Sequence, residues 1–545
     1  MATDDENILV EINNLFVNFY TYQGVVQAIE GVDLVVKNGE TLGLVGETGC
    51  GKSVTASSIM KLILSPPGKI ESGSVYFMEP PEVRAKRMEY EAEARAWFTK
   101  LPEVEKKKLT ATYTRFTGFK KRVKPLTSKD VDKTVVPDIA PPRVISLYLA
   151  NKASKLPKND KMTQDAVRKN YDLLSKSNVY MQKIRGKFIS MIFQEPTSAL
   201  NPVFTAGDQI AEVIMQHRKT EMAGRVLKRL DKEIELIKSK DRPRKLPTSH
   251  TLDMPEDKRA VHKNPARRMA YECSVCHTEV SKDDDWCDNC GVEFHSDMSW
   301  RLRPLVLQTY KRLLQSVQKN PDSKNPFISR IPLIKRYKIE LYDEAFREAV
   351  RMLEVVRIPD PKGVAIRYPY ELSGGMQQRV MIAIALACNP KLLIADEPTT
   401  ALDVTIQGQI LKLMRDLKEA YGSSILLITH NLGVVAEMCD RVGVMYAGSM
   451  AEVGISRDIF KRPMHPYTQG LMKAVPSIQM EAERLYTIRG SVPNLIYPPS
   501  GCRFHPRCDY AKKHCERVKP ELTEIEKGHF ASCHMVAKAE GYVRE

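Results

Sequence analysis

A short stretch near the N-terminus has the residue types of a phosphate-binding loop. Residues 46–53 read GETGCGKS and match the pattern G-x-x-x-x-G-K-[ST] in full. Glycines let backbone N–H groups close around a phosphate, and the helix that follows directs its N-terminus at the anion. Lys52 would contact the β- and γ-phosphates of ATP, and the Ser53 hydroxyl would bind Mg²⁺. We expect ATP to be bound through Gly46, Glu47, Thr48, Gly49, Cys50, Gly51, Lys52 and Ser53.

Acidic and polar side chains follow three apolar runs elsewhere in the chain. The run LLIA ends in Asp396 and Glu397, and α/β sheets place active-site groups at such carboxyl ends. We expect Asp396 to hold Mg²⁺ and Glu397 to act as general base on the attacking water. His430 ends the run SILLITH and would face the γ-phosphate. Gln194 ends the run ISMIFQ and is a candidate ligand of Mg²⁺ or water.

A second candidate anion site opens a predicted helix after residue 371. Residues 372–379 read LSGGMQQR, in which Ser373 suits a helix N-cap and two glycines leave backbone N–H groups bare. One γ-phosphate cannot need both this segment and the loop at 46–53 within a single subunit.

The LSGGMQQR segment resembles the signature of the ABC ATPase family. In that family two such domains enclose two ATP molecules head to tail, and each signature completes the partner's site. The resemblance implies this role in trans for Leu372, Ser373, Gly374, Gly375, Met376 and Gln377. It also implies that Ala401, Leu402 and Asp403 form the loop between the two sites, that His430 is the γ-phosphate switch, and that an aromatic residue such as Tyr20 stacks on adenine.

Longer stretches are similar to the ATPases of peptide-type importers. They include MIFQEPTSALNPVFT, LACNPKLLIADEPTTALDVT and KRPMHPYTQGLMKAVPS. This resemblance implies an ATP-hydrolysing subunit that energises uptake of oligopeptides or dipeptides, with oligosaccharides as a further option. It implies as partners a second, related ABC ATPase, two transmembrane permease subunits and, indirectly, an extracytoplasmic substrate-binding protein.

Eight of the eleven cysteines form two groups. Cys273, Cys276, Cys287 and Cys290 have the C-x2-C…C-x2-C spacing of a tetrahedral zinc site, so we expect a zinc ribbon at about residues 270–295. Such a ribbon can bind nucleic acid or serve as a structural staple, and we favour the staple.

The second group, at Cys502, Cys508, Cys515 and Cys533, is irregularly spaced. Its spacing indicates a metal site without choosing the metal. The C-terminal stretch GCRFHPRCDYAKKHC resembles that of peptide-importer ATPases, which can hold a [4Fe–4S] cluster, and this favours iron–sulfur over zinc. We expect a structural role, because nothing in the sequence places these cysteines near the ATP.

The elements that position these groups alternate between strands and helices, which indicates a largely parallel α/β sheet. We predict an α/β fold: an ABC-type P-loop nucleotide-binding domain with a helical subdomain, two insertions and a C-terminal metal-binding extension. The expected parts are an ATPase core at 1–80, 187–216 and 341–465, basic insertions at 81–186 and 217–340, and the extension at 466–545.

The positive charge is concentrated in the two insertions. Residues 81–186 carry 25 basic and 12 acidic side chains, and residues 217–340 carry 27 and 18, against a net charge of +16 for the chain. These segments suit phospholipid headgroups or nucleic acid, or they are solvated surfaces. A soluble ABC ATPase acting on nucleic acid is therefore the alternative function, although the more specific importer-like stretches argue against nucleic acid as a partner.

The chain shows neither a secretory signal nor an apolar run long enough to cross a bilayer. We therefore expect a soluble chain at the cytoplasmic face of the cell membrane, bound peripherally to its membrane subunits.

Overall fold

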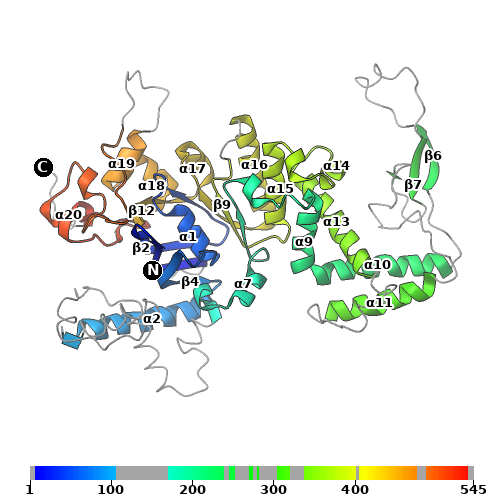
Figure 1. The fold of residues 1–545 in the computed structure, drawn as a ribbon, viewed down its shortest axis with the longest axis horizontal. Coiled ribbons are helices and arrows are strands. Elements are labelled where there is room, and N and C mark those ends of the chain that lie inside the picture. Colours follow the sequence, from blue (N-terminus) through cyan, green and yellow to red (C-terminus); the bar gives the residue numbers. More distant parts are fainter. Residues whose placement is uncertain are drawn as a thin grey trace. The chain divides into compact units, whose positions relative to one another are not determined.

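The computed structural model describes ten ranges of the chain. They are residues 7–102, 104–105, 170–238, 245–251, 269–273, 279–280, 303–319, 337–399, 404–474 and 487–537. The chain divides into two compact units, Met1–Leu200 with Ser373–Glu545, and Asn201–Leu372. Figure 1 shows the elements along the chain.

The first unit is built on an eight-stranded sheet with the order β13-β14-β12-β11-β3-β10-β9-β5. Neighbouring strands from β11 to β5 run parallel, so their carboxyl ends meet at one edge of the sheet. Every residue of β3, β9 and β10 is buried, as the continuous apolar runs of doubly covered parallel strands require. The strands are β3 (Thr41–Val45), β5 (Ile189–Ile192), β9 (Leu392–Asp396), β10 (Ser424–Ile428), β11 (Arg441–Tyr446), β12 (Ser449–Ile455), β13 (Thr523–Glu526) and β14 (His529–Ala531).

A second, antiparallel sheet shares the same hydrophobic core. Its order is β2 (Gly24–Lys37), β1 (Ile8–Thr21) and β4 (Gly68–Phe77). Ile12 and Val17 of β1 belong to one buried cluster with Leu44 of β3 and Ile394 of β9. The two sheets are therefore fastened to each other by apolar side chains from both.

Helices complete this unit. Helix α1 packs against β2 and β9, α15 against β5, and α17 against β3. The helices are α1 (Lys52–Ile59), α2 (Pro81–Thr99), η1 (Leu173–Ser175), α7 (Asn178–Ile184), α8 (Pro196–Ala199), α15 (Gly374–Leu386), α16 (Val404–Tyr421), α17 (Leu432–Met438), α18 (Ser456–Lys461) and α19 (Pro466–Lys473). None of the described helices combines the length and hydropathy needed to span a membrane.

Both described ends of the expected insertion at 81–186 are attached to this unit. Arg87 of α2 is 1% exposed, lies 4.0 Å from the Tyr76 ring centroid and forms an ion pair of 2.8 Å with Glu11. The Asp172 carboxylate accepts the backbone N–H of Val75 at 3.0 Å. The chain is thus back in the core by about residue 170, earlier than the expected boundary at 187.

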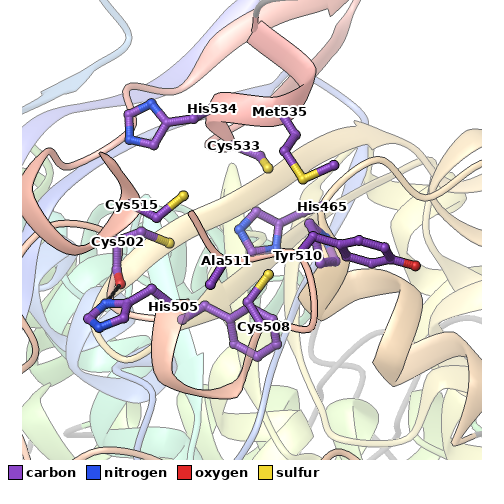
Figure 2. A pocket seen from close by; sticks show the side chains of 12 residues that line it. His465, Cys502, His505, Cys508, Tyr510, Ala511, Cys515, Cys533, His534 and Met535 are labelled. Carbon is purple, nitrogen blue, oxygen red and sulfur yellow. Dashed lines mark hydrogen bonds between the residues drawn. The ribbon is translucent and has the colours of Figure 1, made fainter. Parts of the chain in front are cut away.

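The C-terminal extension continues the main sheet. Strand β14 pairs with β12, placing Phe530 opposite Val453. Short helices η5 (His505–Arg507), α20 (Lys513–Arg517) and α21 (His534–Ala537) carry or flank the four cysteines. Figure 2 shows these cysteines around a single pocket.

The second unit is mainly helical and also carries a small sheet, β6-β7-β8. Its helix α10 packs against α11 and α13, and α9 packs against α13 and α14. The elements are α9 (Ala206–His217), α10 (Lys219–Lys238), β6 (Lys245–Thr251), β7 (Met269–Cys273), β8 (Glu279–Val280), α11 (Arg303–Lys319), α13 (Tyr337–Val355), α14 (Pro361–Ala365) and η4 (Pro369–Glu371).

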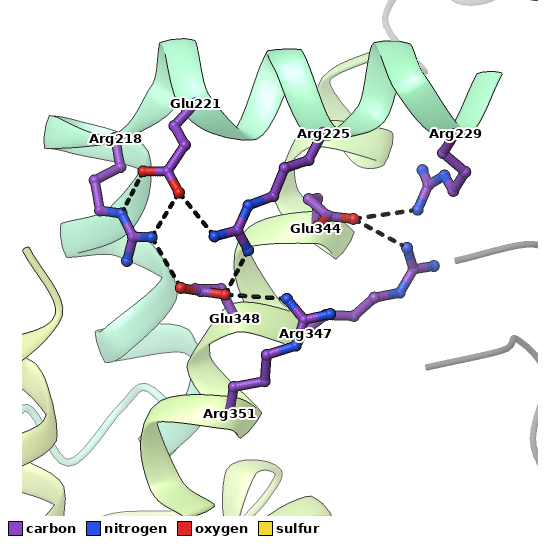
Figure 3. Close-up of polar contacts among 8 residues, drawn as sticks. All are labelled: Arg218, Glu221, Arg225, Arg229, Glu344, Arg347, Glu348 and Arg351. Atoms are coloured by element: carbon purple, nitrogen blue, oxygen red, sulfur yellow. Dashed lines mark hydrogen bonds and ion pairs between the residues drawn. The ribbon is translucent and has the colours of Figure 1, made fainter. Parts of the chain in front are cut away.

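A network of ion pairs fixes α10 against α13 (Figure 3). Glu348 accepts from Arg218 at 2.9 Å and from Arg225 at 2.6 Å, and it also pairs with Arg351 at 3.2 Å. Burial acts to raise the pKa of Glu348, but the hydrogen bond from Arg225 and the charges of both arginines outweigh burial and lower it. The carboxylate is therefore held ionised where the two helices meet.

We predict that Glu348→Gln lowers the free energy of unfolding by about 2 kcal/mol, because three arginines lose the charge of their shared, buried partner. The folded-state pKa of Glu348 is depressed. Its stabilisation is therefore present above the ordinary glutamate value of about 4.3 and is lost as the pH falls through the lower folded-state value. Urea unfolding between pH 3 and pH 7 measures both effects.

The matched control is Glu437→Gln, which removes an exposed ion pair with Arg415. This change should cost less than about 1 kcal/mol. Equal losses for the two variants would contradict a special role for the Glu348 network.

Candidate functional site

The phosphate-loop segment lies between β3 and α1, as its sequence predicts. Gly46, Gly49 and Gly51 have φ angles of 150°, 80° and 103°, values that favour glycine. A Cβ atom on Gly46 would lie 2.2 Å from the Met445 carbonyl oxygen, and one on Gly51 would lie 2.8 Å from that of Ala28. The loop therefore requires glycine for its backbone angles and for the closeness of its neighbours.

Hydrogen bonds within the protein hold two side chains of the loop, Lys52 and Ser53. Lys52 is 7% exposed, and its Nζ donates to the carbonyl oxygens of Gly46 at 2.8 Å and Glu47 at 3.1 Å. Ser53 Oγ donates to Asp396 Oδ1 at 3.0 Å. A hydroxyl and a carboxylate oxygen side by side form a donor set that suits Mg²⁺.

Three strand ends bring the polar residues of the site together. The Glu397 carboxylate accepts from Gln194 Nε2 at 3.0 Å and lies 3.2 Å from His430 Nδ1. Gln194 follows β5, Glu397 follows β9 and His430 follows β10. The sequence predictions for these three residues thus converge on one cluster at the carboxyl edge of the sheet.

The backbone at Glu397 is unusual. Its φ of 47° lies in the left-handed region, and its N–H donates to the Ile428 carbonyl at 2.8 Å. Strain of this kind is common where a side chain must be aimed at a reaction. Beside it, burial raises the pKa of Asp396, the Ser53 hydrogen bond opposes this, and the Glu397 charge adds to it. A divalent cation would relieve the repulsion between the two carboxylates.

Tyr20 lies near the end of β1 and is 44% exposed. Its hydroxyl donates to Glu71 Oε1 at 2.6 Å, and Lys69 Nζ lies 6.0 Å from its ring centroid. These contacts hold the ring while leaving part of it open. Adenine stacking on Tyr20 stays a prediction.

The segment after Leu372 begins a helix as expected. The Ser373 side chain accepts the N–H of Met376 at 3.4 Å and caps α15. A Cβ on Gly374 would meet no atom within 4 Å, so the first turn is open on that side. Gln377 is buried along the helix. The predicted inter-site residues Ala401, Leu402 and Asp403 lie outside the described residues.

The four C-terminal cysteines share one pocket (Figure 2). Burial raises the pKa of Cys502 to about 11, and the other three thiols add to the rise. Yet within the described ranges no three His, Cys, Asp or Glu side chains lie close enough together to hold a single metal ion. Iron–sulfur binding by these four cysteines therefore stays a prediction.

The predicted zinc ligands fall largely outside the described residues. Cys273 is the last residue of β7, whereas Cys276, Cys287 and Cys290 are not described. The zinc ribbon therefore stays a prediction.

The C-terminal extension reaches the phosphate loop, which the sequence analysis did not foresee. Arg507 and Tyr467 both contact Glu47, across 460 and 420 residues of sequence. Neither hydrophobic periodicity nor motif spacing in the sequence can reveal a contact between residues so far apart. The expectation that nothing places the cysteine extension near the ATP site needs correction, because Arg507 precedes Cys508 directly.

Two protein-family models match parts of the chain. A family described as the C-terminal region of oligopeptide/dipeptide transporters matches residues 451–515, and the ABC transporter family matches residues 29–138 and 288–400.

Two curated relatives match nearly the whole chain, and a third matches about a third of it at higher identity. The dipeptide transport ATP-binding protein DppD of Bacillus subtilis is 30% identical over 525 residues, which is 96% of this chain and 94% of that protein. The oligopeptide transport ATP-binding protein AppD of the same organism is 31% identical, covering 97% and 96%. The oligopeptide transport ATP-binding protein OppD of Escherichia coli is 53% identical over 190 residues, 35% of this chain and 56% of that protein. The chain is an ABC-type ATPase and belongs to the family of ATP-binding subunits of oligopeptide and dipeptide ABC transporters.

Proposed function

We propose that this ATPase energises the import of oligopeptides or dipeptides through partner membrane subunits. The observation that carries the proposal is the match of residues 451–515 to the oligopeptide/dipeptide transporter C-terminal region, joined to relatives over the whole chain whose names give these substrates. Two permease subunits, a second ATPase and an extracytoplasmic binding protein complete the assembly. The chain would then act at the cytoplasmic face of the membrane.

The nucleotide site suggests a role for each clustered residue. Lys52 would leave the carbonyl oxygens of its own loop for the β- and γ-phosphates of ATP. Ser53 and Asp396, already hydrogen-bonded to each other, would hold Mg²⁺ together with Gln194. Glu397 would accept a proton from the attacking water at its carboxylate.

His430 and Gln194 would act with Glu397 as sensors of the γ-phosphate. Both side chains contact the Glu397 carboxylate, so a displacement of either side chain on γ-phosphate binding would move the general base. The open first turn of α15 would complete the site of a partner ATPase, where its bare N–H groups meet the γ-phosphate. Hydrolysis then requires two subunits, which links ATP turnover to closure of the pair.

The C-terminal pocket supports a further proposal, that Cys502, Cys508, Cys515 and Cys533 hold a [4Fe–4S] cluster. Four thiolates are the ligand set that such a cluster needs. When bound, the cluster would supply a rigid crosslink between the short helices of the extension. We keep the zinc ribbon of Cys273, Cys276, Cys287 and Cys290 as a companion proposal.

We predict that Glu397→Gln binds ATP but hydrolyses it at least a hundredfold more slowly, since the amide keeps the side chain's shape and cannot take a proton. Cells carrying only this variant should lose uptake of labelled peptide. ATP turnover by the purified protein and uptake of labelled dipeptide, oligopeptide and oligosaccharide measure these effects.

Normal turnover by Glu397→Gln would remove this residue from the base role. Loss of oligosaccharide uptake with intact peptide uptake would overturn the peptide proposal while leaving the ATPase intact. Purification with nucleic acid in place of membrane subunits would favour the alternative of a soluble ATPase acting on nucleic acid.

We predict that Lys52→Ala weakens ATP binding more than tenfold, because a buried cation is lost from the loop. Calorimetric titration with ATP measures this. The control is Lys391→Ala, an exposed lysine just before β9 at the opposite end of the strand from Asp396. Unchanged affinity in Lys52→Ala would rule out the assigned contact.

We predict that protein purified without oxygen is brown and contains about four irons and one zinc per chain. Cys508→Ser should bleach the colour and keep the zinc, and Cys276→Ser should lose the zinc and keep the colour. Visible absorption and metal analysis are the measurements. Colourless anaerobic protein with two zinc ions would contradict the cluster.

A further inference from the structure

Every polar group of Glu47, the second residue of the phosphate loop, has a partner. Its carbonyl oxygen accepts from Lys52 Nζ at 3.1 Å and from the Cys50 N–H at 3.2 Å. Its own N–H donates to the Tyr467 hydroxyl at 2.9 Å. Its carboxylate accepts two bonds from Arg507, at 2.6 and 3.1 Å. Glu47 thus joins the catalytic lysine to two residues of the C-terminal region.

Contacts with residues other than Glu47 also hold the Arg507 side chain in place. Its side chain is 6% exposed, and its Nε donates to the Arg489 carbonyl at 2.9 Å. The guanidinium lies 5.6 Å from the Tyr446 ring centroid and donates to the Tyr446 hydroxyl at 3.3 Å. A fixed, planar guanidinium that donates twice to one carboxylate sets that carboxylate's orientation.

Tyr467 is equally constrained. It is fully buried at the start of α19, and its ring centroid lies 4.6 Å from that of Tyr446 and 5.4 Å from that of Phe504. The packing of these rings therefore fixes the position of the Tyr467 hydroxyl, which accepts the hydrogen bond from the Glu47 N–H. Phe504 also lines the cysteine pocket, which links the packing to the extension.

We propose that Arg507 and Tyr467 are positioning residues for ATP binding: they fix Glu47, and with it the backbone of the phosphate loop, in the arrangement that receives the phosphates. The proposal rests on the ATPase activity and is independent of the transported substrate. A loop ordered in advance loses less conformational entropy when ATP arrives, so its affinity is higher. A purely structural role would instead make these residues fasten the extension to the core without affecting affinity.

The test measures the dissociation constant for ATP by calorimetry in EDTA, where hydrolysis is blocked, together with the melting temperature. Arg507→Gln should weaken ATP binding about tenfold, a coupling of about 1.4 kcal/mol. Arg507→Lys, which keeps the charge but not the double bond to the carboxylate, should fall between Arg507→Gln and the unmodified chain. Tyr467→Phe should weaken binding about threefold while keeping the ring packing.

A double-mutant cycle separates positioning from general stability. In a Glu47→Gln background, Arg507→Gln should change affinity no more than about twofold, because its partner is already gone. The matched control is Arg462→Gln, which removes the ion pairs of an exposed arginine with Asp458 and Glu526 in the C-terminal region and should leave affinity unchanged.

Unchanged affinity for both Arg507→Gln and Tyr467→Phe would overturn the proposal, as would an equal loss for Arg507→Gln in both backgrounds. If Arg507→Gln does not fold, Tyr467→Phe and the Arg507→Lys comparison decide the matter. A failure of the unmodified chain to bind ATP would count against the ATPase assignment itself, which this design distinguishes from a failure of the coupling.

Discussion

Backbone carbonyl oxygens of two neighbouring strands lie so close to the phosphate loop that only glycine fits at the positions they face. These contacts keep the loop in its shape. Gly46 faces the Met445 carbonyl of β11, and Gly51 faces the Ala28 carbonyl of β2. These two strands belong to different sheets, so the loop sits where the sheets meet. The shared hydrophobic core that joins the sheets therefore determines the geometry of phosphate binding as well as the stability of the fold.

The same sheet explains why the remaining site residues assemble without a dedicated scaffold. Parallel strands end at a common edge, so Gln194, Glu397 and His430 need only follow β5, β9 and β10 to meet. The left-handed backbone at Glu397 turns its carboxylate toward the other two. Burial and the Glu397 charge raise the pKa of Asp396, and the Ser53 hydrogen bond opposes them. A cation at this edge would favour the ionised carboxylate.

The predictable parts of this molecule are those that depend on neighbours in sequence. The residues of the loop at 46–53 are contiguous in sequence, and so are the two acids that follow the run LLIA. As predicted, the loop follows strand β3 and the acids lie at the end of strand β9. The contacts of Arg507 and Arg87 were not predictable, because a single arginine in a basic segment looks like a solvated one. Only the fold reveals that Arg87 is buried against Tyr76 and that Arg507 meets Glu47. The return of the chain to the core near residue 170 was not predicted, because the bonds of Asp172 to Val75 and Leu174 leave no apolar pattern in the sequence, although Leu173 beside it is buried.

The strand order of the main sheet also has a consequence for synthesis on the ribosome. Strand β3, which leads into the phosphate loop, lies between β10 and β11, and Gly39 just before it bonds to Ser424 across 385 residues. The β1–β2–β4 sheet can form early from local antiparallel pairs, but β3 has no partner until most of the chain has emerged. The nascent loop thus lacks its supporting strands until residues 424–446 have been synthesised, and we expect productive ATP binding only after that point. Long non-local pairing of this kind exposes an apolar strand during elongation and makes chaperone assistance valuable for this chain.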